Sequence, residues 1–227
     1  MSRPAPALVR EGAVTLVGGA PFAGGDLRAA LTRAPTLAAA DSGADRARAL
    51  GLEPEIVIGD MDSLSSEGRA ALGDRVLPIP EQDSTDFEKC LTRIDAPLVL
   101  AVGFAGARLD HALAVFNTLA RCPDRRCVVL GDGDAATLCP PRIALDLAPG
   151  TRVSLFPMAP VTGRSAGLTW PIDGIAFAPG GAIGTSNRAT GPVRLEMDAP
   201  GMLLMVPPGA RDALLAGLDA APRWPAP

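Results

Sequence analysis

The first 131 residues alternate between short apolar runs and longer segments with helical periodicity, which restricts the possible folds more than any other feature. Several runs are apolar at nearly every position, as parallel strands buried on both faces are. The runs are residues 13–18, 36–40, 55–59, 75–79, 98–103 and 127–131. In residues 83–94 apolar side chains recur at i, i+3, i+4 and i+7, and a second helical pattern covers about 110–120. Strands that alternate with helices predict βαβ units, a parallel sheet and a ligand site at the carboxyl ends of its strands.

After about Gly133 the pattern changes to short β segments separated by glycine and proline. These segments are residues 142–147, 152–157, 174–177 and 193–197. In the last of them, three apolar residues alternate with Arg194 and Glu196, which is typical of a half-buried antiparallel strand. Only residues 211–220 have a helical pattern in this part of the chain. The sequence therefore predicts an α/β fold, with an N-terminal parallel-sheet domain over residues 1–133 and a smaller, mostly-β domain over residues 134–227.

Composition argues against several classes of function. The formal charge is −4, with 21 Lys+Arg against 25 Asp+Glu and no basic block, so we expect no nucleic-acid partner. A site built from several histidines is impossible because His111 is the only one. No apolar run approaches the length of a membrane span, and no secretory signal or lipidation motif is visible. The four cysteines lack C-x-x-C spacing. We therefore expect a reduced, cytoplasmic protein without a membrane segment.

Aspartates follow two of the predicted strands. Asp41 comes directly after the run TLAAA, and Asp60 and Asp62 follow the strand EIVIG. In extended backbone, residues i and i+2 point the same way, so we expect Asp60 and Asp62 to share one face. Two ionised carboxylates held close together repel each other, and Mg²⁺ would relieve that repulsion. The alternative interpretation is a turn with helix-capping aspartates.

Residues 82–86, Gln-Asp-Ser-Thr-Asp, open the helical pattern at 83–94. One interpretation is a variant capping box with Asp83 as the N-cap and Asp86 at the N3 position. The other is a polyphosphate–metal site at the start of the helix. Lys89, the only lysine of the chain, lies one turn further on and off the apolar stripe, so its default interpretation is an exposed helix lysine.

A Gly-x-x-Gly loop at residues 103–106 follows the fifth predicted strand and precedes the second helix. Glycines permit close approach of the backbone, a helix N-terminus favours anions, and Arg108 is suited to grip a phosphate. His111 is more typical of a hydrogen-bonding residue at a helix start. The sequence contains no P-loop, so any nucleotide must be held by another arrangement.

Together these segments resemble the thiamine pyrophosphokinase family. The resemblance rests on six motifs in order: ADSGADRA (40–47), IGDMDS (58–63), QDSTDFEKCL (82–91), GARLDHALAVFNTL (106–119), GLTW (167–170) and GTSN (184–187). The chain departs from the family at Ser42, where glycine is common, and after GTSN, where Arg188 and Ala189 supply no aromatic ring.

The resemblance implies transfer of pyrophosphate from ATP to thiamine, which gives thiamine diphosphate and AMP, with Mg²⁺ as cofactor. It implies that residues 1–133 form the catalytic domain that binds Mg-ATP, and that residues 134–227 form a β-sandwich-like domain that binds thiamine. It also implies a homodimer with active sites at the subunit interface.

Site residues follow from the matching motifs. The implied metal ligands are Asp60, Asp62 and Asp86. These three and Asp110 are the implied catalytic residues, and Asp86 and Asp110 are both candidates for a general base. The implied ATP-binding residues are Asp41, Gln82, Thr85, Lys89 and Arg108. The implied thiamine-binding residues are Thr185, Ser186 and Asn187. Trp170 is either an aromatic platform for the cationic thiazolium or a core residue.

Two alternative functions stay open at the level of sequence. D-M-D-S-L loosely resembles the motif of haloacid-dehalogenase-type phosphatases, which would make Asp60 the nucleophile of a metal-dependent phosphohydrolase. However, Leu64 stands where that motif has Thr or Val, and the motif follows the third strand rather than the first. The other alternative is a non-catalytic regulator that binds thiamine or a nucleotide.

Overall fold

The computed structural model describes residues 4–106, 108–131 and 133–226. The chain divides into two compact units. Unit 1 comprises Met1–Thr118 and Cys127–Gly131, and unit 2 comprises Leu119–Arg126 and Asp132–Pro227.

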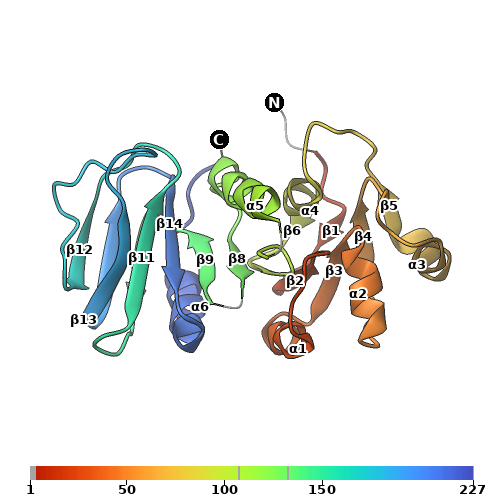
Figure 1. Cartoon of the computed structure of the whole chain (residues 1–227), viewed down its shortest axis with the longest axis horizontal. Coiled ribbons are helices and arrows are strands. Elements are labelled where there is room, and N and C mark those ends of the chain that lie inside the picture. The colour runs from red at the N-terminus through yellow and green to blue at the C-terminus, as the bar shows by residue number, and fades with distance from the viewer. Residues whose placement is uncertain (1–3, 107, 132, 227) are drawn as a thin grey trace. The chain divides into compact units, whose positions relative to one another are not determined.

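Unit 1 is built on a parallel sheet, with strand order β8–β7–β2–β3–β4–β5 among the described residues (Figure 1). Its strands are β2 (Val14–Val17), β3 (Thr36–Ala40), β4 (Ile56–Gly59), β5 (Val76–Pro78), β7 (Val99–Val102) and β8 (Cys127–Leu130). Each of them lies within one of the six apolar runs, so those strand predictions are confirmed. β2, β7 and β8 are buried at every position, which explains why their sequences do not alternate between apolar and polar residues.

The order of the strands places the predicted ligand edge. From β2 the chain adds β3, β4 and β5 on one side, and it then returns to place β7 on the other side of β2. A reversal of this kind opens a crevice at the carboxyl ends of the central strands. The loops after β2, β3, β4 and β7 therefore meet at one edge.

Helices connect these strands. They are α1 (Gly24–Arg33), α2 (Gly43–Ala49), α3 (Ser66–Leu72), α4 (Asp86–Arg93) and α5 (Leu109–Arg121). The second predicted helix is confirmed as α5, whereas α4 begins three residues later than expected. Strand β6 (Ile94–Asp95) follows α4 directly and pairs in parallel with the short strand β1 (Leu8–Val9). No helix in the described part of the chain is both long enough and apolar enough to span a membrane.

Unit 2 is rich in antiparallel strands, as predicted. They are β9 (Ala135–Leu138), β10 (Arg142–Leu145), β11 (Arg152–Pro157), β12 (Gly163–Leu168), β13 (Gly184–Met197) and β14 (Met202–Val206), and α6 (Arg211–Ala220) follows them. The long strand β13 pairs with β11 through its first residues and with β10 and β12 through its last. Its end alternates between buried and exposed residues, which confirms the prediction for 193–197.

The strand predicted at residues 174–177 is wrong. Gly174 has a φ of 79°, and Ile175 N–H donates to the carbonyl of Ile172 at 3.1 Å, so the chain turns here. Only Phe177 makes isolated bridges, to Val161 and Ala182. The apolar residues at 174–177 do not indicate a strand. They reflect Phe177, whose side chain is buried in the core although it lies on a loop.

Candidate active site

A cavity of about 720 Å³ opens at the carboxyl edge of the parallel sheet in unit 1. Its lining comes from the loops after β2, β3, β4 and β7, from residues 82–85 and from the first turns of α4 and α5. Sites for small-molecule ligands are commonly of this size.

Glycines allow these loops to approach one another. A Cβ added at Gly43 would lie 2.2 Å from the carbonyl oxygen of Val17, and one at Gly18 would lie 2.5 Å from that of Gly103. No side chain fits at either distance. Gly18 thus provides close packing between the ends of β2 and β7.

Asp41 is the most buried carboxylate of the site, with 4% of its surface exposed. It follows β3 with a φ of 43°, and its Oδ2 accepts a hydrogen bond from Ser63 N–H at 3.1 Å. Its buried Oδ1 has no partner among the described residues. Burial raises the pKa of Asp41 to about 6; the Ser63 N–H opposes the rise, whereas the neighbouring carboxylates of Asp86 and Asp62 add to it.

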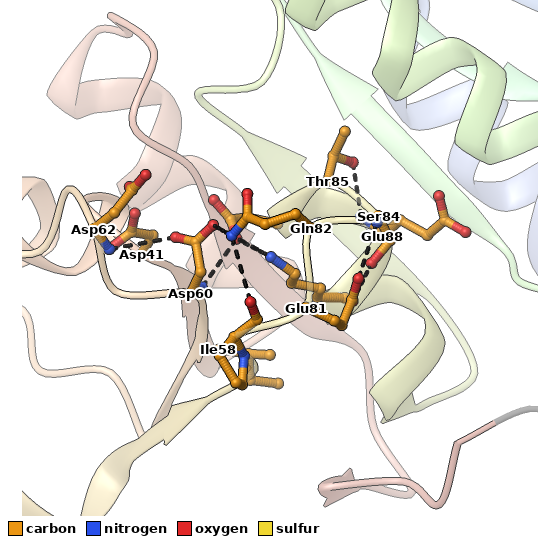
Figure 2. Close-up of polar contacts among 12 residues, drawn as sticks. Asp41, Ile58, Asp60, Asp62, Glu81, Gln82, Ser84, Thr85 and Glu88 are labelled. Carbon is orange, nitrogen blue, oxygen red and sulfur yellow. Dashed lines mark hydrogen bonds and ion pairs between the residues drawn. The ribbon is translucent and has the colours of Figure 1, made fainter.

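Asp60 and Asp86 flank the ammonium group of Lys89. Figure 2 shows Asp60 between Asp62 and Gln82. Lys89 Nζ lies 3.4 Å from Asp60 Oδ2 and 3.4 Å from Asp86 Oδ1. The side chain of Gln82 also donates to Asp60 Oδ2, at 3.0 Å. The default interpretation of Lys89 as an exposed residue is wrong, because only 1% of it is exposed. A lysine can be buried to this extent because its charge is paired with two carboxylates.

The pKa values follow from these contacts. Burial acts to raise the pKa of Asp60, but the hydrogen bonds from Gln82 and Asp62 N–H and the charge of Lys89 outweigh it and lower that pKa. The pKa of Asp86 is raised, first by burial and then by the charge of Asp60. Burial acts to lower the pKa of Lys89, yet the two carboxylates outweigh it and raise that pKa. Lys89 is therefore a fixed positive charge at neutral pH.

Three carboxylates fit a divalent cation. Asp41, Asp60 and Asp86 each offer an oxygen atom, and these atoms all lie within 4.8 Å of one another. The unpartnered Oδ1 of Asp41 is a buried acceptor of the kind that a cation satisfies. Carboxylate oxygens are also the protein ligands that Mg²⁺ prefers.

This group of three differs from the predicted metal set, since it contains Asp41 where Asp62 was expected. The expectation that Asp60 and Asp62 share a face in extended backbone is wrong, because Met61 between them has a φ of 67°. Asp62 is exposed, but it lines the cavity and its carboxylate adds to the rise in the pKa of Asp41. Its role as a metal ligand stays a prediction.

The start of α4 also differs from the predicted capping box. Thr85 is the N-cap, and its Oγ1 accepts a hydrogen bond from Glu88 N–H at 3.3 Å. Asp83 lies two residues before this N-cap, in a loop that is held by Glu81, a residue that sequence analysis missed. The Glu81 carboxylate accepts hydrogen bonds from Asp83 N–H at 2.8 Å and from Ser84 N–H at 3.0 Å, and the Ser84 hydroxyl also donates to it. As a result, Asp86 occupies the first helical position, one turn before Lys89.

Arg108 and His111 line the cavity, whereas Asp110 is not among its lining residues. Arg108 and Asp110 form an exposed ion pair, with 2.7 Å between Nη2 and Oδ2. The hydrogen bond from Arg108 lowers the pKa of Asp110. The structure therefore does not bring Asp110 together with Asp60 and Asp86. Ala107, in the middle of this motif, lies outside the described residues.

The predicted thiamine-side residues lie in unit 2. Trp170 is 58% exposed, so its interpretation as a core residue is wrong. Thr185 and Ser186 are exposed near the start of β13, and Ser186 has a φ of 62°. Asn187 is buried, with 5% exposed.

The fold and the site of unit 1 define a class: parallel α/β proteins whose strand ends carry a carboxylate site suited to a metal ion and a phosphorylated ligand. Within that class, residues 27–130 match the family model "Thiamin pyrophosphokinase, catalytic domain". The match includes Asp41, Asp60 and Asp86. Residues 27–130 are therefore similar to the catalytic domain of this family.

Individual proteins of this name are similar to the same part of the chain. Thiamine pyrophosphokinase 1 of Arabidopsis thaliana is 30% identical over 155 residues, which are 60% of this chain and 58% of that protein. Thiamin pyrophosphokinase 1 of Caenorhabditis elegans is 25% identical over 154 residues, 60% of this chain and 63% of that protein. The aligned segment thus spans about three fifths of the length of these curated relatives.

Solved structures show the same fold. Thiamin pyrophosphokinase from Geobacillus thermodenitrificans has a TM-score of 0.70 at 24% identity, covering 86% of this chain and 96% of that one. The Candida albicans protein has a TM-score of 0.73 at 14% identity, covering 91% and 95% of the two chains. The combination of a parallel α/β part and an antiparallel β-rich part is therefore common to this chain and to these structures.

Proposed function

We propose that the protein is a thiamine pyrophosphokinase, which transfers pyrophosphate from ATP to thiamine and releases AMP. The observation that carries this proposal is the convergence of Asp41, Asp60 and Asp86 beside a cavity of substrate size, within the segment that matches the family's catalytic domain. A pure binding protein has no evident need for three clustered carboxylates.

The reaction sets clear electrostatic requirements. The hydroxyl oxygen of thiamine forms a bond to the β-phosphorus of ATP, and the bond from that phosphorus to the oxygen bridging to the α-phosphate breaks, so that AMP leaves. Transfer of this kind depends mainly on positioning and on neutralising charge. Mg²⁺ held by Asp41, Asp60 and Asp86, with Asp62 as the further predicted ligand, would supply positive charge to the phosphates.

Other residues of the chain serve this arrangement. Gln82 and Lys89 fix the Asp60 carboxylate through hydrogen bonds of 3.0 and 3.4 Å. Arg108 lines the same cavity and is our candidate for a phosphate contact. Thr85 contributes through the start of α4, because its side chain caps the helix that carries Asp86.

The hydroxyl proton of thiamine must pass to a base. We place Asp86 ahead of Asp110 in this role, because burial raises the pKa of Asp86 and an ion pair with Arg108 lowers that of Asp110. A carboxylate whose pKa lies nearer to neutrality is the more effective base.

We propose that the thiamine site is formed with the help of four residues of unit 2: Trp170, Thr185, Ser186 and Asn187. We assign Mg-ATP binding to residues 1–133 and thiamine binding to residues 134–227. We also propose a homodimer with active sites at the subunit interface, which light scattering of the purified protein would test.

The direct test is to incubate the purified protein with ATP, MgCl₂ and thiamine and to quantify the products. Equal amounts of AMP and thiamine diphosphate are expected, and none with EDTA in place of MgCl₂. Release of inorganic phosphate with a trapped aspartyl-phosphate on Asp60 would instead identify the phosphohydrolase alternative. Binding of ATP and thiamine without any product would identify the regulator.

A further inference from the structure

Trp170 is an exposed ring on a loop whose backbone is held at several points. The loop follows β12, and the Trp170 side chain is 58% exposed. In the residue before Trp170, Thr169 N–H donates to the carbonyl of Arg188 at 2.8 Å. Two residues after Trp170, Ile172 is 2% exposed and its N–H donates to Ser165 Oγ at 3.1 Å. The loop is therefore fixed while its largest side chain lies in solvent.

The side chain of Asn187 makes two hydrogen bonds to the backbone of Trp170. Asn187 Oδ1 accepts a hydrogen bond from Trp170 N–H at 3.2 Å, and Asn187 Nδ2 donates to the Trp170 carbonyl at 2.6 Å. The same Oδ1 also accepts from Arg188 N–H at 2.8 Å. One amide thus holds both backbone polar groups of the residue that carries the exposed ring.

Only an amide of this length offers a donor and an acceptor in this arrangement. Aspartate has no donor for the Trp170 carbonyl, and leucine has neither a donor nor an acceptor. Both acceptor positions of Asn187 Oδ1 are already used within the protein. With 5% of the residue exposed, Asn187 has little capacity left for a ligand.

We infer that Asn187 is a positioning residue, which fixes the Trp170 ring as a preformed platform for a cationic aromatic ligand and acts through Trp170 rather than by contact with that ligand. A platform that is already ordered binds more tightly, because no loop has to be immobilised on binding. The identity of the ligand, the thiazolium ring of thiamine, rests on the proposed function. The clamp, by which we mean the two hydrogen bonds from the Asn187 side chain to the backbone of Trp170, rests on the structure.

The first test needs no ligand. The chain has two tryptophans, so in a Trp224→Phe background the emission reports Trp170 alone. In this background Asn187→Asp and Asn187→Leu should both give faster decay of the Trp170 fluorescence anisotropy than the parent. Asn117→Asp, an exposed asparagine on α5, is the matched control and should change nothing. An unchanged anisotropy decay in folded Asn187 variants would overturn the clamp.

The second test asks whether Asn187 acts through Trp170. Asn187→Asp should raise the KM for thiamine about tenfold, with kcat and the KM for ATP within about twofold of wild type. In a Trp170→Ala background the same substitution should change the KM for thiamine no further, because the group it positions is gone. If the two effects multiply instead, Asn187 contacts thiamine directly and the inference is wrong.

The two tests also separate the inference from the proposed function. If the wild-type protein makes no thiamine diphosphate and thiamine does not quench Trp170 emission, the proposed function fails and with it the ligand named here. The anisotropy measurement on the ligand-free protein still decides whether Asn187 clamps the ring. Quenching of Trp170 by thiamine in the wild type, weakened in Asn187→Asp, supports both.

Discussion

At the scale of single residues, the acidic site is defined by an imbalance of charge. Three carboxylates converge, but Lys89 pairs with only two of them, Asp60 and Asp86. Asp41 is buried beside the remaining negative charge, and its pKa is raised to about 6, first by burial and then by the neighbouring carboxylates. The metal-free site therefore costs stability whenever Asp41 is ionised.

This cost gives Asp41 a pH signature. Its pKa is about 6 in the folded state against an ordinary value of 3.8 for aspartate, so the folded protein holds the proton more tightly than the unfolded chain does. As pH rises from about 4 to 6, the metal-free protein should therefore lose up to about 3 kcal/mol of unfolding free energy through Asp41. Asp41→Asn removes this contribution.

The measurement is urea unfolding of wild type and Asp41→Asn in EDTA from pH 4 to pH 7. The variant should become progressively more stable than the wild type across this range, and it should bind Mg²⁺ more weakly. A stability difference that does not change with pH would contradict the assigned pKa.

Lys89 should matter most when no cation is bound. Lys89→Met leaves Asp60 and Asp86 facing each other without a positive charge, and loss of one partner from a buried ion pair typically costs about 3 kcal/mol. Unfolding in EDTA should show this loss, and added MgCl₂ should recover part of it. Replacement of an exposed helix cation, Arg69→Met, should change stability by less than about 0.5 kcal/mol. Equal losses with and without MgCl₂ would contradict the electrostatic explanation.

Asp62 is exposed, yet it lines the cavity and its carboxylate adds to the rise in the pKa of Asp41. We expect Asp62→Asn to lower kcat by about a hundredfold or more while the far-UV circular dichroism and the melting temperature stay near those of wild type. The physical reason is loss of one negative charge where the phosphates and the metal are proposed to bind. Near-normal turnover would remove Asp62 from the site.

At the scale of elements, the start of α2 shows how closely the backbone is packed behind the site. A Cβ at Gly43 would lie 2.2 Å from the Val17 carbonyl oxygen at the end of β2. Gly43→Ala should therefore destabilise the protein by at least about 2 kcal/mol, since β2 and α2 must separate to make room. Gly25→Ala in α1 is the matched control: nothing lies within 4 Å of its added Cβ, so it should be neutral or slightly stabilising. Chemical denaturation of both variants compares them, and equal stability would show that α2 shifts without cost.

The packing of the helices and strands also explains which of them could be predicted from the sequence. Strands of unit 1 were predictable because burial on both faces leaves continuous apolar runs. Helix α2 was not, because its buried residues are Gly43, Ala44 and Ala47, which are too small to produce an apolar stripe. In unit 2, the apolar residues around Phe177 looked like a strand, although the turn at Gly174 prevents one.

The position of the site could be predicted from the sequence, but the set of residues that converge in it could not. Aspartates at strand ends indicated where carboxylates would gather, since parallel strands end at one edge of their sheet. Which of them converge depends on the backbone of Met61, whose φ of 67° no periodicity could reveal. The burial of Lys89 depends on Asp60, which is 29 residues away along the chain. Contacts of this kind become visible only once the fold is known.

At the scale of the whole molecule, the proposed ATP site is assembled from segments far apart in sequence but all within unit 1. Binding of Mg-ATP should therefore slow amide hydrogen exchange in the loops at residues 59–63 and 80–86, because a ligand that binds only the folded state suppresses local opening. The hairpin of β12 and β13 in unit 2 serves as the internal reference for ATP alone. Exchange measured by mass spectrometry with Mg-ATP, and with ATP in EDTA, compares the two conditions. Protection that does not depend on the metal would contradict the proposed role of the carboxylates.

The burial of Lys89 has a further consequence for the whole chain. The other basic side chains, 20 of the 21 Lys and Arg residues, are arginines, so the only side-chain amine is the one enclosed between Asp60 and Asp86. Acetylation, carbamylation and ubiquitin attachment at a side-chain amine all require an accessible lysine. In the folded protein these modifications find no exposed lysine, and Lys89 becomes a target only in molecules in which the contacts of Lys89 with Asp60 and Asp86 have opened.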